Sequence, residues 1–160
     1  MNAQEFSYQL HESRIFGATP AAVYRAFVDP RLLAAWYPRA GWSMPPKEVE
    51  IEPRPGGRLC YVLVSTHDPA RRVVRSAEIS DAQEGSSLAW TKESLPGSIA
   101  EERAPARRVQ VEFRPESHGR TCLVLREGPL SEAAEIDARE CWNCSFSRLD
   151  RVLADMTVLR

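Results

Sequence analysis

The sequence predicts an α+β fold in which an antiparallel sheet is covered on one face by a long helix near the carboxyl end. Two observations support this prediction. Between residues 47 and 127 the chain repeats short segments rich in β-branched and aromatic residues, each bounded by turn residues. Near the carboxyl end the apolar residues instead recur every three or four positions, the period of an amphipathic helix. Only this helix is large enough to cover the sheet.

The first predicted element is a strand over residues 6–16, where apolar and polar residues alternate. The apolar residues of one parity are Phe6, Tyr8, Leu10 and Phe16. Glu12 and Arg14 fall on the same face. Charges on a buried face must be paired or hydrogen-bonded. The two side chains could therefore form a structural salt bridge, or Arg14 could bind the carboxylate or carbonyl of a ligand.

Two short helices follow this strand. Thr19 is a good N-cap, and Pro20 suits the first helical position because its missing N–H has no partner there. The pair Asp29–Pro30 repeats the same start signal, which predicts a second helix that runs to about Trp36.

About six strands come next. They are expected within residues 47–53, 58–65, 71–80, 86–93, 107–115 and 120–127. The segment Pro115–Gly119 between the last two predicts a hairpin. The charge-mixed loop Pro96–Pro105 could gate a cavity or serve an interface.

The final helix is predicted from about Ala138 to Met156, with Asp137 and Glu140 as a capping pair. It contains a C-x-x-C segment, Cys141–Cys144, and segments of this type occur in redox sites and in metal sites. Redox pairs occupy helix N-termini, and here Cys141 would lie beyond the first turn. A tetrahedral metal site needs about four ligands, and the sequence has no second paired motif. Packing is therefore the preferred interpretation.

The composition limits the function classes. A chain of 160 residues suits one domain, expected to span residues 1–160. The net charge of -1 gives no overall attraction to nucleic acid or to an anionic membrane. We find no signal peptide and no membrane span, so a cytoplasmic location with four free thiols is expected. No motif implies a metal or another cofactor.

Several stretches together resemble the START-like (Bet v 1-like, SRPBCC) superfamily. Within it the chain is similar to the family of activator of heat-shock protein 90 ATPase homologues. The matching stretches are "RIFGATPAAVYRAFVDPRLLAAWY", "RPGGRLCYVL", "LAWTKE", "GRTCLVL" and "CWNCSFSRLDRVL". Two positions depart from the family pattern. Cys141 stands before Trp142 where glycine is usual, and Arg126–Glu127 stands where a histidine often follows the last strand.

The resemblance implies a helix-grip fold, in which a curved sheet wraps around the long helix and leaves an apolar cavity between them. Three functions follow as alternatives. The first is binding of a small hydrophobic or amphipathic molecule in that cavity. The second is a protein-interaction module related to chaperone ATPase activation. The third is a polyketide cyclase-like enzyme, which could use Glu12, Tyr61 or a water molecule as acid or base.

We expect the first function, with an unidentified ligand and no catalytic residues. The expected ligand-binding residues are Arg14, Trp36, Trp42, Tyr61, Trp90, Phe113 and Trp142. Ligand pockets are mostly apolar and are often lined by aromatic side chains. Most aromatic residues of a protein, however, belong to its core. A chaperone is the alternative partner. Pairing of edge strands would give a homodimer, which nothing in the sequence requires.

Overall fold

The computed structural model describes residues 3–92 and 105–158, so all but the last residue of the predicted loop Pro96–Pro105 lies outside the described residues. The strands are β1 (Tyr8–Phe16), β2 (Trp42–Ser43), β3 (Glu50–Ile51), β4 (Arg58–Ser65), β5 (Arg72–Gln83), β6 (Ser87–Lys92), β7 (Arg107–Glu116) and β8 (Arg120–Leu130). The helices are α1 (Pro20–Val28), α2 (Pro30–Trp36) and α3 (Glu132–Val158), with short 3-10 turns at Ala3–Phe6, Pro46–Glu48 and Ser117–Gly119.

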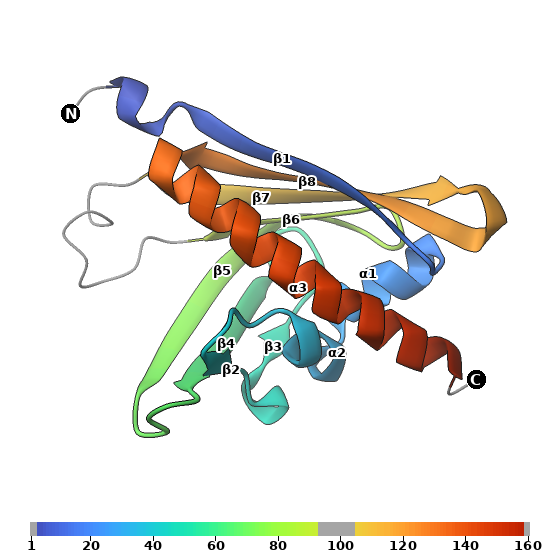
Figure 1. Cartoon of the computed structure of the whole chain (residues 1–160), viewed down its shortest axis with the longest axis horizontal. Helices are drawn as coiled ribbons and strands as arrows, with labels where there is room; N and C mark the ends of the chain where they lie inside the picture. Colours follow the sequence, from blue (N-terminus) through green and yellow to red (C-terminus); the bar gives the residue numbers. More distant parts are fainter. Residues whose placement is uncertain (1–2, 93–104, 159–160) are drawn as a thin grey trace.

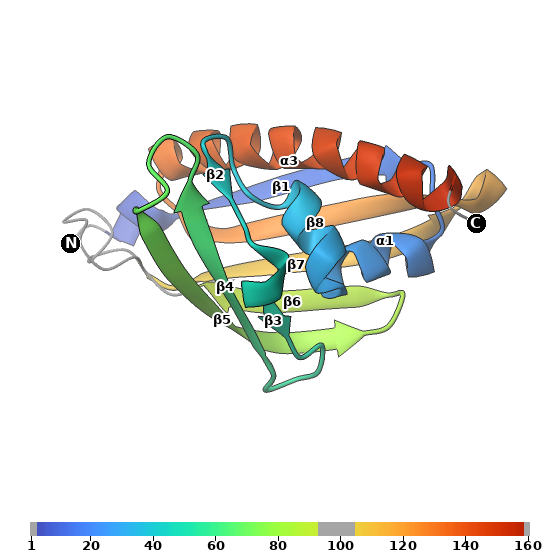
Figure 2. The same cartoon turned by 90° about the horizontal axis from the view of Figure 1, so that it is seen from below.

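The strands form one curved antiparallel sheet in the order β1-β8-β7-β6-β5-β4-β2, and β3 pairs with β4. Helix α3 crosses the inner face of this sheet (Figure 1). The view from below shows α3 along one side of the molecule, with α1 below its carboxyl-terminal half (Figure 2). The predicted α+β helix-grip architecture and the hairpin around Ser117–Gly119 are confirmed.

The core forms where α3 meets the sheet and the two short helices. Phe146 of α3 is 1% exposed and contacts Phe16 of β1, with ring centroids 5.6 Å apart. On its other side it stacks on Trp36 of α2 at 6.4 Å. One side chain of α3 therefore links the first strand to the second short helix.

The first strand follows the predicted parity at Leu10 and Phe16, which are fully buried. The prediction is wrong for Tyr8, whose side chain is 41% exposed. The register between β1 and β8 shifts between Tyr8 and Leu10, so the alternation is interrupted there. Phe6 belongs to the preceding 3-10 turn and not to the strand.

Helix α3 begins six residues earlier than predicted, at Glu132. Ser131 caps it, because its Oγ accepts a hydrogen bond from the Ala134 N–H at 3.2 Å. Glu132 and Glu135 also place negative charge in the first turn, where the helix dipole favours it. Asp137 is therefore inside the helix. None of the helices in the described part combines the length and apolar character needed to span a membrane.

Replacing Phe146 with alanine is expected to lower the free energy of unfolding by about 3–5 kcal/mol, because truncation leaves a cavity in the core. Urea unfolding followed by circular dichroism measures this loss. Ser147→Ala, at the next and exposed position of α3, is the control and should change the free energy by no more than about 0.5 kcal/mol. Equal effects of the two substitutions would contradict the packing described for Phe146.

Candidate ligand-binding cavity

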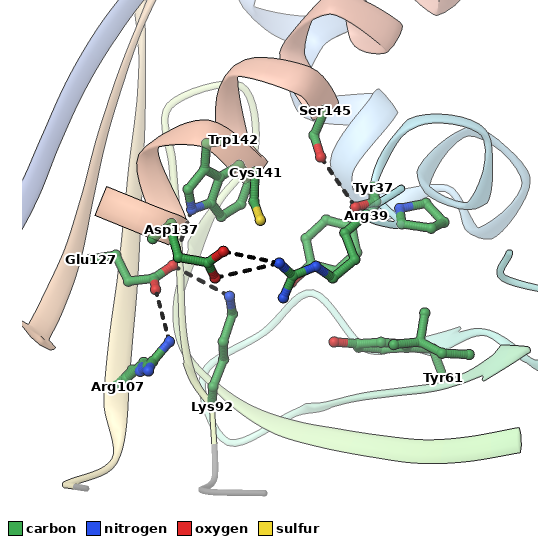
Figure 3. Close-up of a pocket in the computed structure, with 13 residues that line it drawn as sticks. Tyr37, Arg39, Tyr61, Lys92, Arg107, Glu127, Asp137, Cys141, Trp142 and Ser145 are labelled. Atoms are coloured by element: carbon green, nitrogen blue, oxygen red, sulfur yellow. Dashed lines mark hydrogen bonds and ion pairs between the residues drawn. The ribbon is translucent and has the colours of Figure 1, made fainter. Parts of the chain in front are cut away.

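A cavity of about 160 Å³ lies between α3, the sheet and the segment that follows α2 (Figure 3). Its lining combines aromatic and aliphatic side chains with five charged ones. The lining residues are Tyr37, Pro38, Arg39, Tyr61, Leu63, Lys92, Arg107, Glu127, Asp137, Ala138, Cys141, Trp142 and Ser145.

Three charged residues of the lining come from neighbouring strands. Lys92 ends β6, Arg107 begins β7 and Glu127 lies near the end of β8. Lys92 pairs with Arg107 in the ladder, and Glu127 pairs with Val109, two residues further along β7. Each charged residue continues the inward-facing parity of its strand. The inner face therefore changes from apolar to charged at one end of these three strands.

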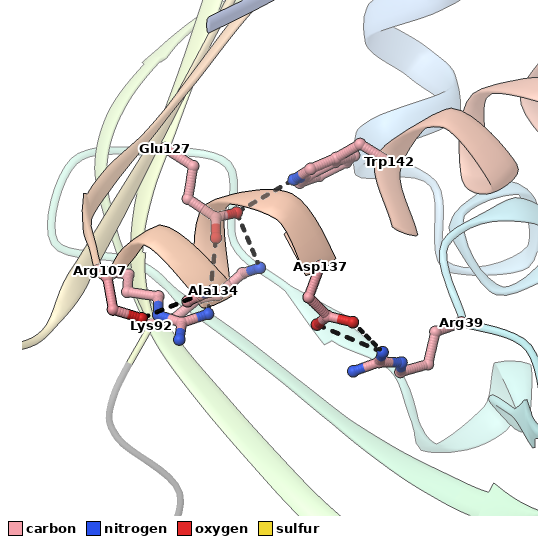
Figure 4. A network of polar contacts seen from close by, with 8 residues as sticks. Arg39, Lys92, Arg107, Glu127, Ala134, Asp137 and Trp142 are labelled. Atoms are coloured by element: carbon pink, nitrogen blue, oxygen red, sulfur yellow. Dashed lines mark hydrogen bonds and ion pairs between the residues drawn. The ribbon is translucent and has the colours of Figure 1, made fainter. Parts of the chain in front are cut away.

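Glu127 is 1% exposed and is held by three partners (Figure 4). Its Oε1 accepts hydrogen bonds from Trp142 Nε1 at 3.0 Å and from Lys92 Nζ at 3.3 Å. Its Oε2 lies 3.8 Å from a guanidinium nitrogen of Arg107, an ion pair without a hydrogen bond. The Lys92 ammonium also lies 5.5 Å from the centre of the Trp142 ring.

Burial would by itself raise the pKa of the Glu127 carboxyl group. The positive charges of Lys92 and Arg107 and the hydrogen bond from Trp142 outweigh burial, so this pKa lies below its ordinary value. Glu127 is consequently ionised at neutral pH. A carboxylate with a lowered pKa is a weak proton acceptor near pH 7, so it is better suited to holding charges in place than to transferring protons.

Two tyrosines form the aromatic wall of the cavity. The rings of Tyr37 and Tyr61 meet edge to face with centroids 5.7 Å apart, and Tyr37 lies 5.9 Å from Trp142. Burial raises the pKa of both hydroxyl groups, so both are neutral, and the two hydroxyl groups are hydrogen-bonded to each other. Helix α3 helps to fix Tyr37, because Ser145 Oγ donates to its backbone carbonyl at 3.3 Å.

At the solvent side, Arg39 and Asp137 form an ion pair with a nitrogen–oxygen distance of 3.1 Å. Both side chains are more than half exposed, at 54% and 58%. Exposed pairs of this kind contribute little to stability. The pair therefore borders the cavity without adding to its net charge.

Of the seven residues expected to bind a ligand, the structure brings Tyr61 and Trp142 together at this cavity. Trp36, Trp90 and Phe113 are at most 3% exposed and belong to the core. The Trp36 indole N–H donates to the Ala26 carbonyl at 2.9 Å, so α2 is tied to α1.

The other two expected residues lie elsewhere. Trp42 lines a separate hollow beside α2, where the Arg71 guanidinium group lies 5.4 Å from its ring centre. Arg14 does face α3, and it pairs there with Asp150. Glu12 likewise pairs with Arg139 of α3 at 2.5 Å. The two inward charges of β1 thus connect the strand to the helix instead of to each other.

Four lining residues were not among those expected from the sequence to bind a ligand: Tyr37, Lys92, Arg107 and Glu127. A signal for the three charged residues was present in the strand alternation. Glu127, for example, continues the inward series that contains Leu125. A charged residue at the end of such a series is a candidate for a buried polar site, because it must find a partner. No comparable signal singled out Tyr37.

The C-x-x-C segment lies well inside α3. Cys141 is half-buried and lines the cavity, whereas Cys144 is exposed, and both are free thiols. Burial raises the pKa of the Cys141 thiol, which disfavours the reactive thiolate. Within residues 3–92 and 105–158, no three His, Cys, Asp or Glu residues are grouped so that they could hold a metal ion.

The fold and the cavity together define a helix-grip domain with a polar-ended cavity beneath its carboxyl-terminal helix. The family model of the activator of Hsp90 ATPase homolog 1-like proteins matches residues 17–154. The chain therefore belongs to the AHSA1 family, as the sequence resemblance predicted. No curated protein matches the chain.

Solved structures share the fold at low sequence identity. A protein from Nitrosomonas europaea is 18% identical with a TM-score of 0.76, and the match covers 99% of each chain. A protein from Chromobacterium violaceum is 21% identical with a TM-score of 0.75, covering 91% of this chain and 96% of that one. An AHSA1 protein from Silicibacter pomeroyi is 18% identical with a TM-score of 0.72, covering 96% of this chain and all of that one.

A double-mutant cycle with Lys92→Met and Glu127→Gln is expected to give a coupling free energy of about 1–3 kcal/mol at pH 7. Since the pKa of folded Glu127 lies below its unfolded value of about 4.5, this stabilisation is complete above that value. It is lost as the pH falls through the lower, folded pKa. Urea unfolding should therefore give a smaller coupling near pH 3 than at pH 7.

The control is the same cycle with Arg108→Met in place of Lys92→Met. Arg108 is exposed and has the opposite parity to Arg107, so its coupling to Glu127 should stay within about 0.5 kcal/mol. A Lys92–Glu127 coupling that is unchanged or larger near pH 3 would contradict an ionised Glu127.

Proposed function

We propose that the protein binds a small amphipathic molecule in the cavity between the sheet and α3. The observation that carries this proposal is the cavity itself, which has an aromatic wall at one side and an ionic cluster at the other. Tyr37, Tyr61 and Trp142 offer surface to an apolar group. Lys92 and Arg107 offer charged donors to a polar group. Ligand sites are commonly apolar with a few such polar anchors.

The volume limits the size of the ligand. An apolar cavity of about 150 Å³ holds a molecule of the size of benzene. The volume of about 160 Å³ therefore accommodates one ring or a short branched chain. A longer molecule would have to leave part of its length outside, beyond the Arg39–Asp137 pair.

The family description points to a second candidate, a module that contacts a chaperone. That function predicts an interior filled by side chains, so the open volume favours ligand binding. The third candidate, a cyclase-like enzyme, needs an acid or base that exchanges protons near neutral pH. The pKa of Glu127 is lowered and the pKa values of Tyr37 and Tyr61 are raised, so all three lie further from neutral pH than usual.

Native mass spectrometry of the freshly purified protein tests the proposal. We expect an additional mass that disappears after denaturation and solvent extraction, and its value gives the formula of the ligand. A bare chain in repeated preparations, together with capture of a chaperone, would favour the second candidate.

Ala138→Phe is expected to remove at least about nine-tenths of this bound mass, because a phenyl ring there occupies the space of a ring-sized ligand. Ala138 is 7% exposed and belongs to the cavity lining. Ala154→Phe, at an exposed position of the same helix, is the control and should retain the ligand. Thermal unfolding verifies that both variants are folded. Undiminished bound mass in folded Ala138→Phe would contradict the proposed location.

A further inference from the structure

The charged end of the cavity has an excess of positive charge among the residues that the structure describes. Arg39 and Asp137 neutralise each other at the solvent side. Inside, within residues 3–92 and 105–158, two cations, Lys92 and Arg107, face a single carboxylate, that of Glu127. Among the described residues, the inner part of the cluster therefore carries one more positive than negative charge.

Both cations can reach a ligand without leaving Glu127. Lys92 and Arg107 line the cavity and are 31% and 32% exposed. The ammonium group of Lys92 has three N–H groups, and Glu127 accepts from it at 3.3 Å. Arg107 lies 3.8 Å from Glu127, too far for a hydrogen bond to that carboxylate. Figure 4 shows both side chains directed toward Glu127 from the ends of β6 and β7.

Glu127 does more than neutralise one of these charges. Its two oxygens face Lys92 and Arg107 separately, so it holds the cations beside each other on the floor of the cavity. The Trp142 indole N–H fixes the carboxylate from the helix side. A second carboxylate that enters from the cavity would meet two positioned donors, and charge-assisted hydrogen bonds of this kind are strong.

We propose that the ligand is a small carboxylic acid, bound as its anion by Lys92 and Arg107. This inference rests on the proposed function. A single negative charge matches the single excess positive charge, and the ring or short chain of the acid would lie against Tyr37, Tyr61 and Trp142.

Three probes of nearly equal size and shape test this inference: benzoate, benzamide and benzamidine. They carry a negative charge, no charge and a positive charge, respectively. Isothermal titration calorimetry at low ionic strength should show benzoate binding at least about tenfold more tightly than benzamide, with no measurable binding of benzamidine. Equal affinities for benzoate and benzamide would overturn the carboxylate inference and leave the proposed cavity function intact.

Two variants test whether Arg107 binds the carboxylate of the probe. Arg107→Met should weaken benzoate binding about tenfold and leave benzamide binding nearly unchanged, because it removes one cation from the cavity. Arg108→Met is the matched control, since the neighbouring arginine is exposed on the opposite face of β7, and it should change neither affinity. An equal loss of benzoate binding in both variants would overturn the assignment to Arg107.

The preference of the unmodified protein among the three probes does not depend on the folding of any variant. If none of the probes binds, the carboxylate inference is overturned at this ligand size. An additional mass in native mass spectrometry would then still support the proposed function. A chain without bound mass would contradict both the carboxylate inference and the proposed function.

Discussion

The polarity of the cavity depends on one interaction, the burial of the ionised Glu127 carboxylate beneath α3. A buried charge is unfavourable unless it is paired and hydrogen-bonded. Glu127 meets this requirement through Trp142 of α3 and through two cations from the neighbouring strands. The same contacts that make its burial tolerable also fix the two cations at the cavity floor.

The two halves of helix α3 have different structural roles. Towards its carboxyl end, Phe146 and Leu149 are buried and complete the core against the sheet and the short helices. Nearer its amino end, Ala138 and Trp142 form one wall of the cavity. Ion pairs from β1 to Arg139 and Asp150 reinforce the attachment of the helix to the sheet. Because the helix is one rigid element, the packing of its core-forming half also positions the wall of the cavity.

Hydrophobic periodicity predicted the order of strands and helices, and the family resemblance added the helix-grip arrangement of the sheet around the long helix. It was less informative for the cavity. Trp36, Trp90 and Trp142 are all buried aromatic residues, and only the packing of distant segments shows that Trp142 reaches the cavity. The residues expected to bind a ligand therefore remain predictions. Glu127 and Lys92 could have been predicted as site residues, because each places a charge in an inward-facing series of its strand. Their contact with each other could not, because it depends on strand register.

The most direct test of the account is a nitrogen-15 correlation spectrum of the tryptophan indole N–H groups during titration with benzoate. The Trp142 indole donates to Glu127 beside the cations that we propose bind the carboxylate, whereas Trp42 lies at a separate hollow. We expect the Trp142 signal to shift with saturation and the Trp42 signal to remain in place. A shift confined to Trp42, or four unchanged indole signals at benzoate concentrations that saturate binding, would contradict a ligand site beneath α3.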